Sequence, residues 1–270
     1  MTIKLVAIDI DDTLLDPHQQ ITALTKKAIT AALDQGVKIV LCSGRPLAGV
    51  EPYIQELGIN GRQQYIITYN GSIIQNAAGD ILQQHTLSSS DFERLAHFCQ
   101  QEQVHFNVLD DQNNIYTLDH QINYYTLLQA AEIKSGLTVL TEQDLPINFT
   151  LVKGVLTGTK EQLDTIEPLL RQNFGHNYAI TRSLPVLLEV AHSLATKGRA
   201  LRDLSGELNL SLDEVMAIGD EQNDYTMFQT AGTAVLMGNG NNEMKDMADY
   251  ITADNAHDGV TQALNEFVLH

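Results

Sequence analysis

Short segments built only from apolar residues, each followed by a helix-like segment, constrain the fold of this chain more than any other feature. Such runs occur at residues 5–8 (LVAI), 39–42 (IVLC) and 215–218 (VMAI). Strands that are apolar along their whole length are buried on both faces, as in parallel sheets with helices on both sides. The sequence therefore predicts an α/β fold with a Rossmann-like, doubly wound parallel sheet as its core.

The middle of the chain has a different pattern. From about residue 86, helical segments combine with strand-like segments in two rounds, which is typical of an antiparallel sheet in an α+β unit. The alternation of single strands and helices returns before residue 200. We therefore expect one core domain built from residues 1–85 and 187–270, with an inserted α+β domain at residues 86–186, a normal size for a domain.

Charge and composition narrow the function classes. The chain has 16 Lys and Arg against 34 Asp and Glu, a net charge of −18, which disfavours nucleic acid and anionic membranes as partners. No apolar stretch is long enough to cross a membrane, and the N-terminus lacks the pattern of a signal peptide. The two cysteines, Cys42 and Cys99, show no metal-type spacing, and the histidines form no zinc motif. We expect a cytoplasmic protein.

Polar and acidic residues follow three of the apolar strands directly. They are Asp9, Asp11 and Thr13 after the first, Ser43 and Gly44 after the second, and Asp220, Asn223 and Asp224 after the third. In an open parallel sheet, ligands bind beyond the carboxyl ends of the strands, so these groups are expected to converge. Clustered carboxylates without a cation are costly, and the oxygen donors on offer suit Mg²⁺.

Each of these residues also has a purely structural interpretation. An aspartate after a strand is commonly a helix cap or a turn former, and this reading is favoured for Asp220 alone and for Asp12. Ser43 could cap the helix that follows it, Arg45 could be a structural ion-pair partner, and Lys197 could be a solvated lysine in a first helical turn. The combination of DIDDT and GDEQND after apolar strands favours a site.

The combined pattern resembles the haloacid dehalogenase superfamily of phosphohydrolases. The resemblance rests on Asp9-x-Asp11-x-Thr13, then Ser43-Gly44, then the lysine of TKGRAL, then GDEQND, four motifs in the order of that family. About 150 residues separate Ser43 from Lys197, as in the Cof-type branch, whose α/β cap lies between the second and third motifs. The segments YNGS at 69–72 and LMGN at 236–239 are also similar to that branch.

The resemblance implies a chemical role for the acids. Asp9 would be the nucleophile that takes the phosphoryl group, and Asp11 would protonate the leaving alcohol and later activate water. Mg²⁺ would be held by the Asp9 carboxylate, the Asp11 carbonyl and the Asp220 carboxylate. The remaining roles are phosphate binding by Ser43, Gly44, Lys197 and Asn223, and support by Thr13 and Asp224.

The implied function is a Mg²⁺-dependent phosphatase that acts on a small phosphorylated metabolite, such as a sugar phosphate or a phosphorylated cofactor. The inserted domain would act as a cap that supplies specificity contacts. Two alternatives stay open. One is a phosphomutase of the same fold, and the other is a non-catalytic phospho-acceptor or metabolite-binding protein.

Overall fold

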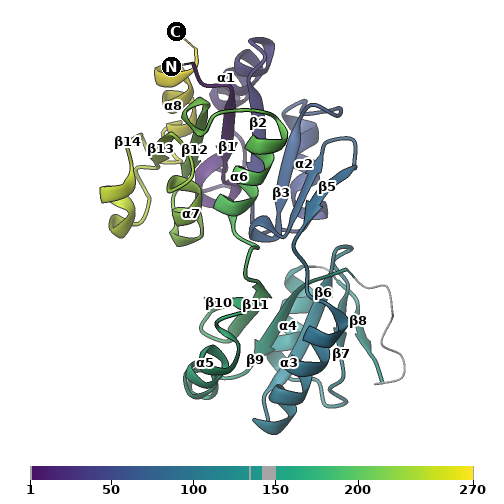
Figure 1. Ribbon diagram of the computed structural model, residues 1–270. Coiled ribbons are helices and arrows are strands. Elements are labelled where there is room, and N and C mark those ends of the chain that lie inside the picture. Colours follow the sequence, from purple (N-terminus) through teal and green to yellow (C-terminus); the bar gives the residue numbers. More distant parts are fainter. Residues whose placement is uncertain (1, 134, 142–149, 270) are drawn as a thin grey trace. The chain divides into compact units, whose positions relative to one another are not determined.

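The chain forms two compact units. The computed structural model describes residues 2–133, 135–141 and 150–269 (Figure 1). The first unit, called the core unit, joins Met1–Gln84 to Thr196–His270, and the second, called the cap unit, is His85–Ala195. Each unit has its own sheet and its own hydrophobic core.

The sequence predicted that the second boundary between the units lies at residue 187. In the structure it lies later, between Ala195 and Thr196. Residues Leu187–His192 form strand β11, which pairs in antiparallel fashion with β10 (Tyr178–Leu184) and β9 (Leu151–Thr157). Leu188 and Val190 of this strand are fully buried in the hydrophobic cluster of the cap unit. β11 is thus a central strand of the cap sheet, and the prediction that residues 187–195 belong to the core was wrong.

The core unit contains an eight-stranded sheet in the order β14-β13-β12-β1-β2-β3-β4-β5. The strands are β1 (Leu5–Ile8), β2 (Lys38–Cys42), β3 (Tyr65–Thr68), β4 (Ile73–Asn76), β5 (Ile81–Gln84), β12 (Val215–Gly219), β13 (Thr233–Leu236) and β14 (Tyr250–Ile251). Every pairing from β14 to β3 is parallel, whereas β4 and β5 form an antiparallel hairpin at one edge. The predicted parallel α/β core is confirmed.

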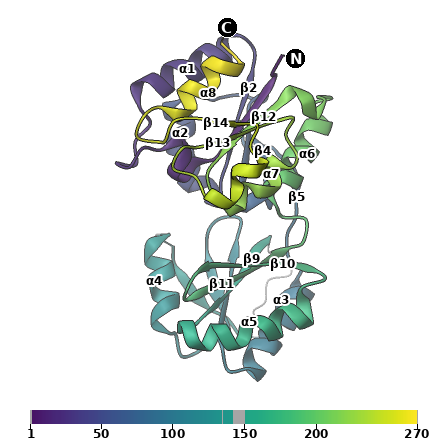
Figure 2. The same cartoon turned by 90° about the vertical axis from the view of Figure 1, so that its left-hand side faces the viewer.

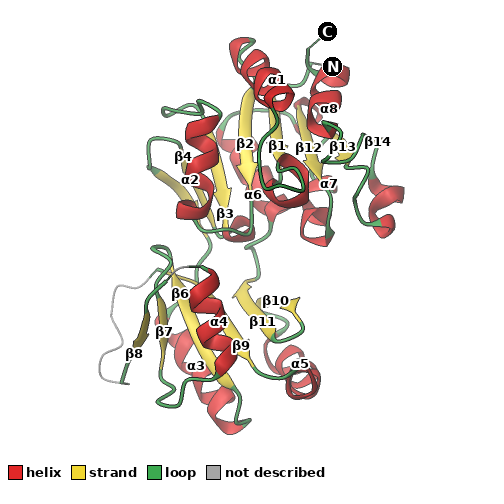
Figure 3. Cartoon of the chain, turned by 180° about the vertical axis from the view of Figure 1, so that it is seen from behind, coloured by secondary structure: helices red, strands yellow, loops and turns green. Residues whose placement is uncertain are grey.

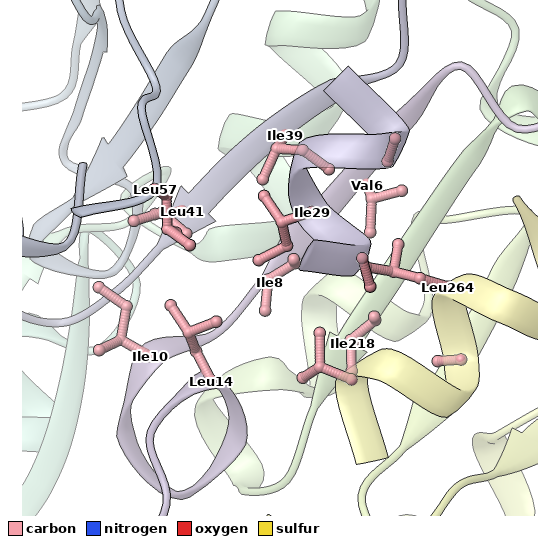
Figure 4. Packing of buried hydrophobic residues seen from close by; sticks show 14 of the residues in the cluster. Val6, Ile8, Ile10, Leu14, Ile29, Ile39, Leu41, Leu57, Ile218 and Leu264 are labelled. Carbon is pink, nitrogen blue, oxygen red and sulfur yellow. The ribbon is translucent and has the colours of Figure 1, made fainter. Parts of the chain in front are cut away.

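Helices cover both faces of this sheet. The helices are α1 (Ala23–Asp34), α2 (Leu47–Glu56), α6 (Lys197–Glu207), α7 (Tyr225–Phe228) and α8 (Gly259–Phe267). On β1, Val6 and Ile8 pack with α1, α2 and α8, as Figure 4 shows for Ile29 and Leu264. The alternate residues Leu5 and Ala7 pack with α6 and α7 on the opposite face. The sheet is therefore doubly wound, and its strands are apolar throughout because both faces are buried.

The cap unit is an α+β layer of its own. Its sheet has the order β10-β11-β9-β6-β7-β8, where the strands not yet introduced are β6 (His105–Asp110), β7 (Ile115–Thr117) and β8 (Leu137–Val139). All its pairings are antiparallel except that of β7 with β8. Helices α3 (Ser89–Gln101) and α5 (Lys160–Phe174) share one hydrophobic cluster with the sheet, and α4 (Tyr124–Glu132) contributes to a second one. Figures 2 and 3 show these three helices beside the strands of the cap sheet.

Within the described ranges, no helix is long and apolar enough to cross a membrane. The longest one, α5, has 15 residues, whereas a spanning helix needs about 20.

Candidate active site

Three parallel strands bring most of the candidate residues to one edge of the core sheet. Asp9 directly follows β1, Ser43 follows β2, and Asp220 follows β12. These strands are adjacent in the order β12-β1-β2-β3, so their carboxyl ends lie side by side. Lys197 is the first residue of α6, which packs on the same sheet. Residues more than 200 positions apart in the sequence thereby meet where open α/β sheets bind their ligands.

A buried lysine links two of the acids. The Lys197 Nζ donates hydrogen bonds to Asp9 Oδ1 at 2.5 Å and to Asp224 Oδ1 at 2.7 Å. Lys197 and Asp224 are fully buried, and Asp9 is 4% exposed. Burial disfavours the charge of the lysine, but Asp224 and Asp9 outweigh it and raise the pKa of Lys197. The alternative of a solvated lysine is therefore wrong, and Lys197 is a charged group inside the site.

Asp224 orients the lysine. Its Oδ1 accepts from Lys197, while its Oδ2 accepts from the backbone amides of Asp220 at 3.0 Å and Glu221 at 3.3 Å. A Cβ at Gly219 would overlap the Asp224 carboxylate, so a glycine is needed where β12 ends. Since both oxygens of Asp224 are engaged, this residue is suited to holding Lys197 and the 219–221 turn in place.

Asp220 is held by Thr13. The Thr13 hydroxyl donates to Asp220 Oδ1 at 2.8 Å, and both side chains are buried. Burial raises the pKa of Asp220 to about 7 against the opposing effect of the Thr13 bond, and the charges of Asp224 and Asp12 add to the rise. An anionic Asp220 is thus costly in the protein alone, and a cation beside it would lower that cost.

The donor set fits a divalent cation. Asp9, Asp220 and Asp224 each place a carboxylate oxygen within 4.8 Å of the others. With all three carboxylates ionised, the cluster and the Lys197 ammonium carry two net negative charges. Burial raises the pKa of Asp9 well above its usual range, so this ionised state is costly until a cation binds. Oxygen-only donors with this charge suit Mg²⁺. The cluster contains Asp9 and Asp220 from the predicted metal ligands, and it also contains Asp224.

The structure places the Asp11 carboxylate outside this cluster. Arg45 holds it through two hydrogen bonds, from Nε to Oδ2 at 2.9 Å and from Nη2 to Oδ1 at 2.5 Å. The guanidinium also lies over the Tyr53 ring, 5.6 Å from its centroid, and the Asp11 bonds raise the pKa of Arg45. Arg45 is therefore the ion-pair partner of Asp11. Each oxygen of Asp11 accepts one of these bonds, so Arg45 and not the acidic cluster holds this carboxylate.

Ser43 and Gly44 directly follow β2, which pairs with β1. Ser43 is fully buried, and its Oγ accepts from the Arg45 amide at 3.1 Å. It does not cap the following helix, because α2 begins at Leu47 with Pro46 in the capping position. A Cβ at Gly44 would lie 3.1 Å from the side-chain atoms of Asn70, so a glycine allows this close approach.

Asn223 and Asn70 lie at the same edge of the core sheet. Asn223 is exposed, and its Nδ2 donates to Asn70 Oδ1 at 3.4 Å. Asn70 lies just beyond the end of β3 at Thr68, with Tyr69 between them, and the sequence interpretation assigned it no role. Its position after a third parallel strand was the signal that could have identified it.

The start of α6 allows a test of how closely Lys197 must be placed. A Cβ at Gly198 would overlap the carbonyl oxygen of Thr226, whereas a Cβ at Gly206 of the same helix would meet nothing within 4 Å. We expect Gly198→Ala to lower the free energy of unfolding by about 1–3 kcal/mol because helix and backbone must separate. Gly206→Ala, the matched control, should raise it by about 0.5–1 kcal/mol. Urea unfolding measures both, and equal effects of the two changes would contradict the close packing.

Comparisons with known proteins find relatives along nearly the whole chain. A family model described as haloacid dehalogenase-like hydrolase matches residues 6–264. The Bacillus subtilis protein YxeH, which carries a phosphatase name, is 33% identical over 267 residues, with 98% of each chain covered. The 5-amino-6-(5-phospho-D-ribitylamino)uracil phosphatase YcsE of the same organism is 30% identical, covering 99% of this chain and 96% of its own.

A solved structure gives the same result for the fold. A haloacid dehalogenase-like hydrolase from Bacteroides thetaiotaomicron superposes with a TM-score of 0.85 at 28% sequence identity. The match covers 98% of this chain and 99% of the other. Both the core and the cap therefore have counterparts in a solved member of the matched family.

Proposed function

Because the chain belongs to the haloacid dehalogenase-like hydrolases and is a phosphatase, we propose that it hydrolyses small phosphate monoesters through a phosphoryl group carried on Asp9. The observation that carries this proposal is the buried Asp9 carboxylate, which Lys197 and Asp220 flank at the ligand-binding edge of the sheet. Sugar phosphates or phosphorylated cofactors are the proposed substrates. The name of the YcsE relative, which contains a phosphorylated ribityl group, supports this class.

The first step is a displacement at phosphorus. A carboxylate oxygen of Asp9 forms a bond to the phosphorus while the bond between phosphorus and the leaving oxygen breaks. Asp11, released from Arg45, donates its proton to that oxygen, so that an alcohol leaves instead of an alkoxide. The product on the protein is an aspartyl-phosphate at Asp9.

The second step returns Asp9 to its free form. Asp11, now a carboxylate, takes a proton from a water molecule as its oxygen attacks the phosphorus. The bond from phosphorus to Asp9 breaks, and inorganic phosphate leaves with Asp11 protonated for the next cycle. Two displacements on one phosphate replace one difficult hydrolysis, which is the benefit of a covalent intermediate.

The surrounding residues bind and orient. Lys197 donates a hydrogen bond to Asp9 Oδ1, and its charge opposes the effect of burial, which raises the pKa of Asp9. The Ser43 hydroxyl, the Gly44 amide and Asn223 are proposed to bind phosphate oxygens. Mg²⁺ would be held by Asp9, Asp220 and the carbonyl of Asp11, and it would neutralise the charges of nucleophile and phosphate.

A turnover assay tests this function. The protein is incubated with Mg²⁺ and p-nitrophenyl phosphate, followed by a panel of sugar phosphates and phosphorylated cofactors, and the released inorganic phosphate is counted per chain. Many phosphates per chain are expected. A phosphomutase would instead move phosphate to a second hydroxyl group, and a phospho-acceptor would release at most about one per chain. No release over the whole panel would contradict the proposal.

The cation requirement has a readout that does not depend on activity. Mg²⁺ that binds the native carboxylate cluster should raise the thermal unfolding midpoint, because binding to the native state at 100 times the dissociation constant stabilises it by about 2.7 kcal/mol. We expect Asp220→Asn to abolish this Mg²⁺-dependent rise and the activity together. Asp34→Asn removes the same charge from the end of α1 and should keep both. An unchanged midpoint of the wild type in EDTA and in Mg²⁺ would exclude the proposed cation site.

A further inference from the structure

The turn after β3 is the most unusual stretch of backbone in the core unit. Tyr69, Asn70 and Gly71 follow one another with φ angles of 50°, 55° and 103°, all in the left-handed region. This region disfavours every residue but glycine, and a tyrosine there is more unusual than an asparagine. Disfavoured backbone that persists in a folded protein is concentrated at functional sites.

This strained turn contacts the residues of the candidate active site on two sides. The Asn70 amide donates to the Ser43 carbonyl at 2.9 Å, and the Tyr69 amide donates to the Arg45 carbonyl at 3.1 Å. On the other side, a Cβ at Gly71 would overlap the carbonyl oxygen of Thr196, the residue before Lys197. The turn therefore cannot move without the phosphate-binding turn at Ser43 or the start of α6.

The side chain of Asn70 lies between two residues that are proposed to bind phosphate. Its amide group sits against Gly44, and its Oδ1 accepts from Asn223 Nδ2 at 3.4 Å. Among the residues that the structure describes, none accepts a hydrogen bond from Asn70 Nδ2. The Asn70 Nδ2 is thus a donor that can bind a ligand beside Gly44, at the sheet edge where the phosphate is proposed to bind.

We propose that Asn70 is a substrate-binding residue whose Nδ2 donates a hydrogen bond to an oxygen of the bound phosphate. The left-handed backbone at residues 69–71 orients this amide group, and the contacts to Ser43 and Thr196 hold that backbone in place. The inference rests on the proposed function, since it assigns a further contact to the same phosphate. An uncharged donor that is already oriented binds an anion without adding a positive charge that would repel the metal.

Two substitutions separate this role from a structural one. Asn70→Gly keeps the left-handed backbone and removes the amide, while Asn70→Asp keeps the backbone preference and the acceptor for Asn223 but replaces the donor by a charge. We expect the affinity for inorganic phosphate in Mg²⁺ to fall by about 10- to 100-fold in Asn70→Gly. The fall should be larger in Asn70→Asp, because a carboxylate repels the anion. Calorimetry measures both, and kcat/KM should fall in parallel.

Asn209 offers a matched control. It is exposed after the end of α6 and has the same left-handed backbone, with a φ of 55°. Asn209→Gly and Asn209→Asp should leave phosphate affinity unchanged. Unchanged phosphate affinity in both Asn70 variants would overturn the inference, and so would an effect on thermal stability alone. If the wild type releases no phosphate from any substrate, the proposed function fails, while phosphate binding by the variants still decides the role of Asn70.

Discussion

Asp9→Asn is expected to reduce kcat by about 10⁴-fold or more, because loss of the nucleophile leaves only binding and charge stabilisation to accelerate the reaction. The substitution keeps the shape of the side chain and its contact with Lys197. It also removes one of three clustered buried carboxylates, of which Asp9 and Asp224 pair with Lys197. Since burial raises the pKa of Asp9, its charge is costly in the folded protein, and the neutral amide removes that cost.

The expected result is therefore an inactive protein that is at least as stable as the wild type in metal-free buffer. Steady-state hydrolysis of p-nitrophenyl phosphate and thermal unfolding in EDTA measure the two properties. Asp12→Asn is the matched control, because Asp12 is exposed with a φ of 55°, a conformation that asparagine also accepts. Its activity should stay near that of the wild type. Activity that survives in Asp9→Asn would rule out Asp9 as the nucleophile.

Lys197→Met is expected to lower stability as well as activity, whereas Asp9→Asn lowers activity alone. It leaves Asp9 and Asp224 buried without their shared cation, and removing one partner from a buried ion pair costs about 3–5 kcal/mol. Urea unfolding in EDTA measures the loss. Lys160→Met removes an exposed lysine that pairs with Asp164 within α5, and its effect should stay below about 1 kcal/mol.

A double substitution shows whether the loss comes from uncompensated charge. Asp224→Asn in the Lys197→Met background removes one of the two buried carboxylates that lost their cation, so part of the lost stability should return. If loss of packing were the cause, the double variant would be as unstable as Lys197→Met or less stable. A wild-type unfolding free energy in Lys197→Met would show that the ion pairs contribute nothing to the core unit.

The local sequence was sufficient to predict the fold class and to place several acidic residues at one edge of the sheet. Apolar strands such as Leu5–Ile8 are buried on both faces, and this requirement alone predicts a parallel sheet covered by helices. The position of Asp9, Ser43 and Asp220 after such strands predicts a common edge, because parallel strands end on the same side. These inferences depend on periodicity and chain direction, which short segments carry by themselves.

Contacts between distant segments were decided only by the tertiary structure. The boundary of the cap unit depends on β11 pairing with β9 and β10, and no property of residues 187–192 alone distinguishes this from pairing in the core sheet. Asp11 pairs with Arg45, 34 positions away, and one of the two partners of Lys197 is Asp9, 188 positions away. The sequence gives the chemical type of a charged side chain. Its partner depends on which strand ends lie side by side, and this is decided by the order of the strands in the sheet.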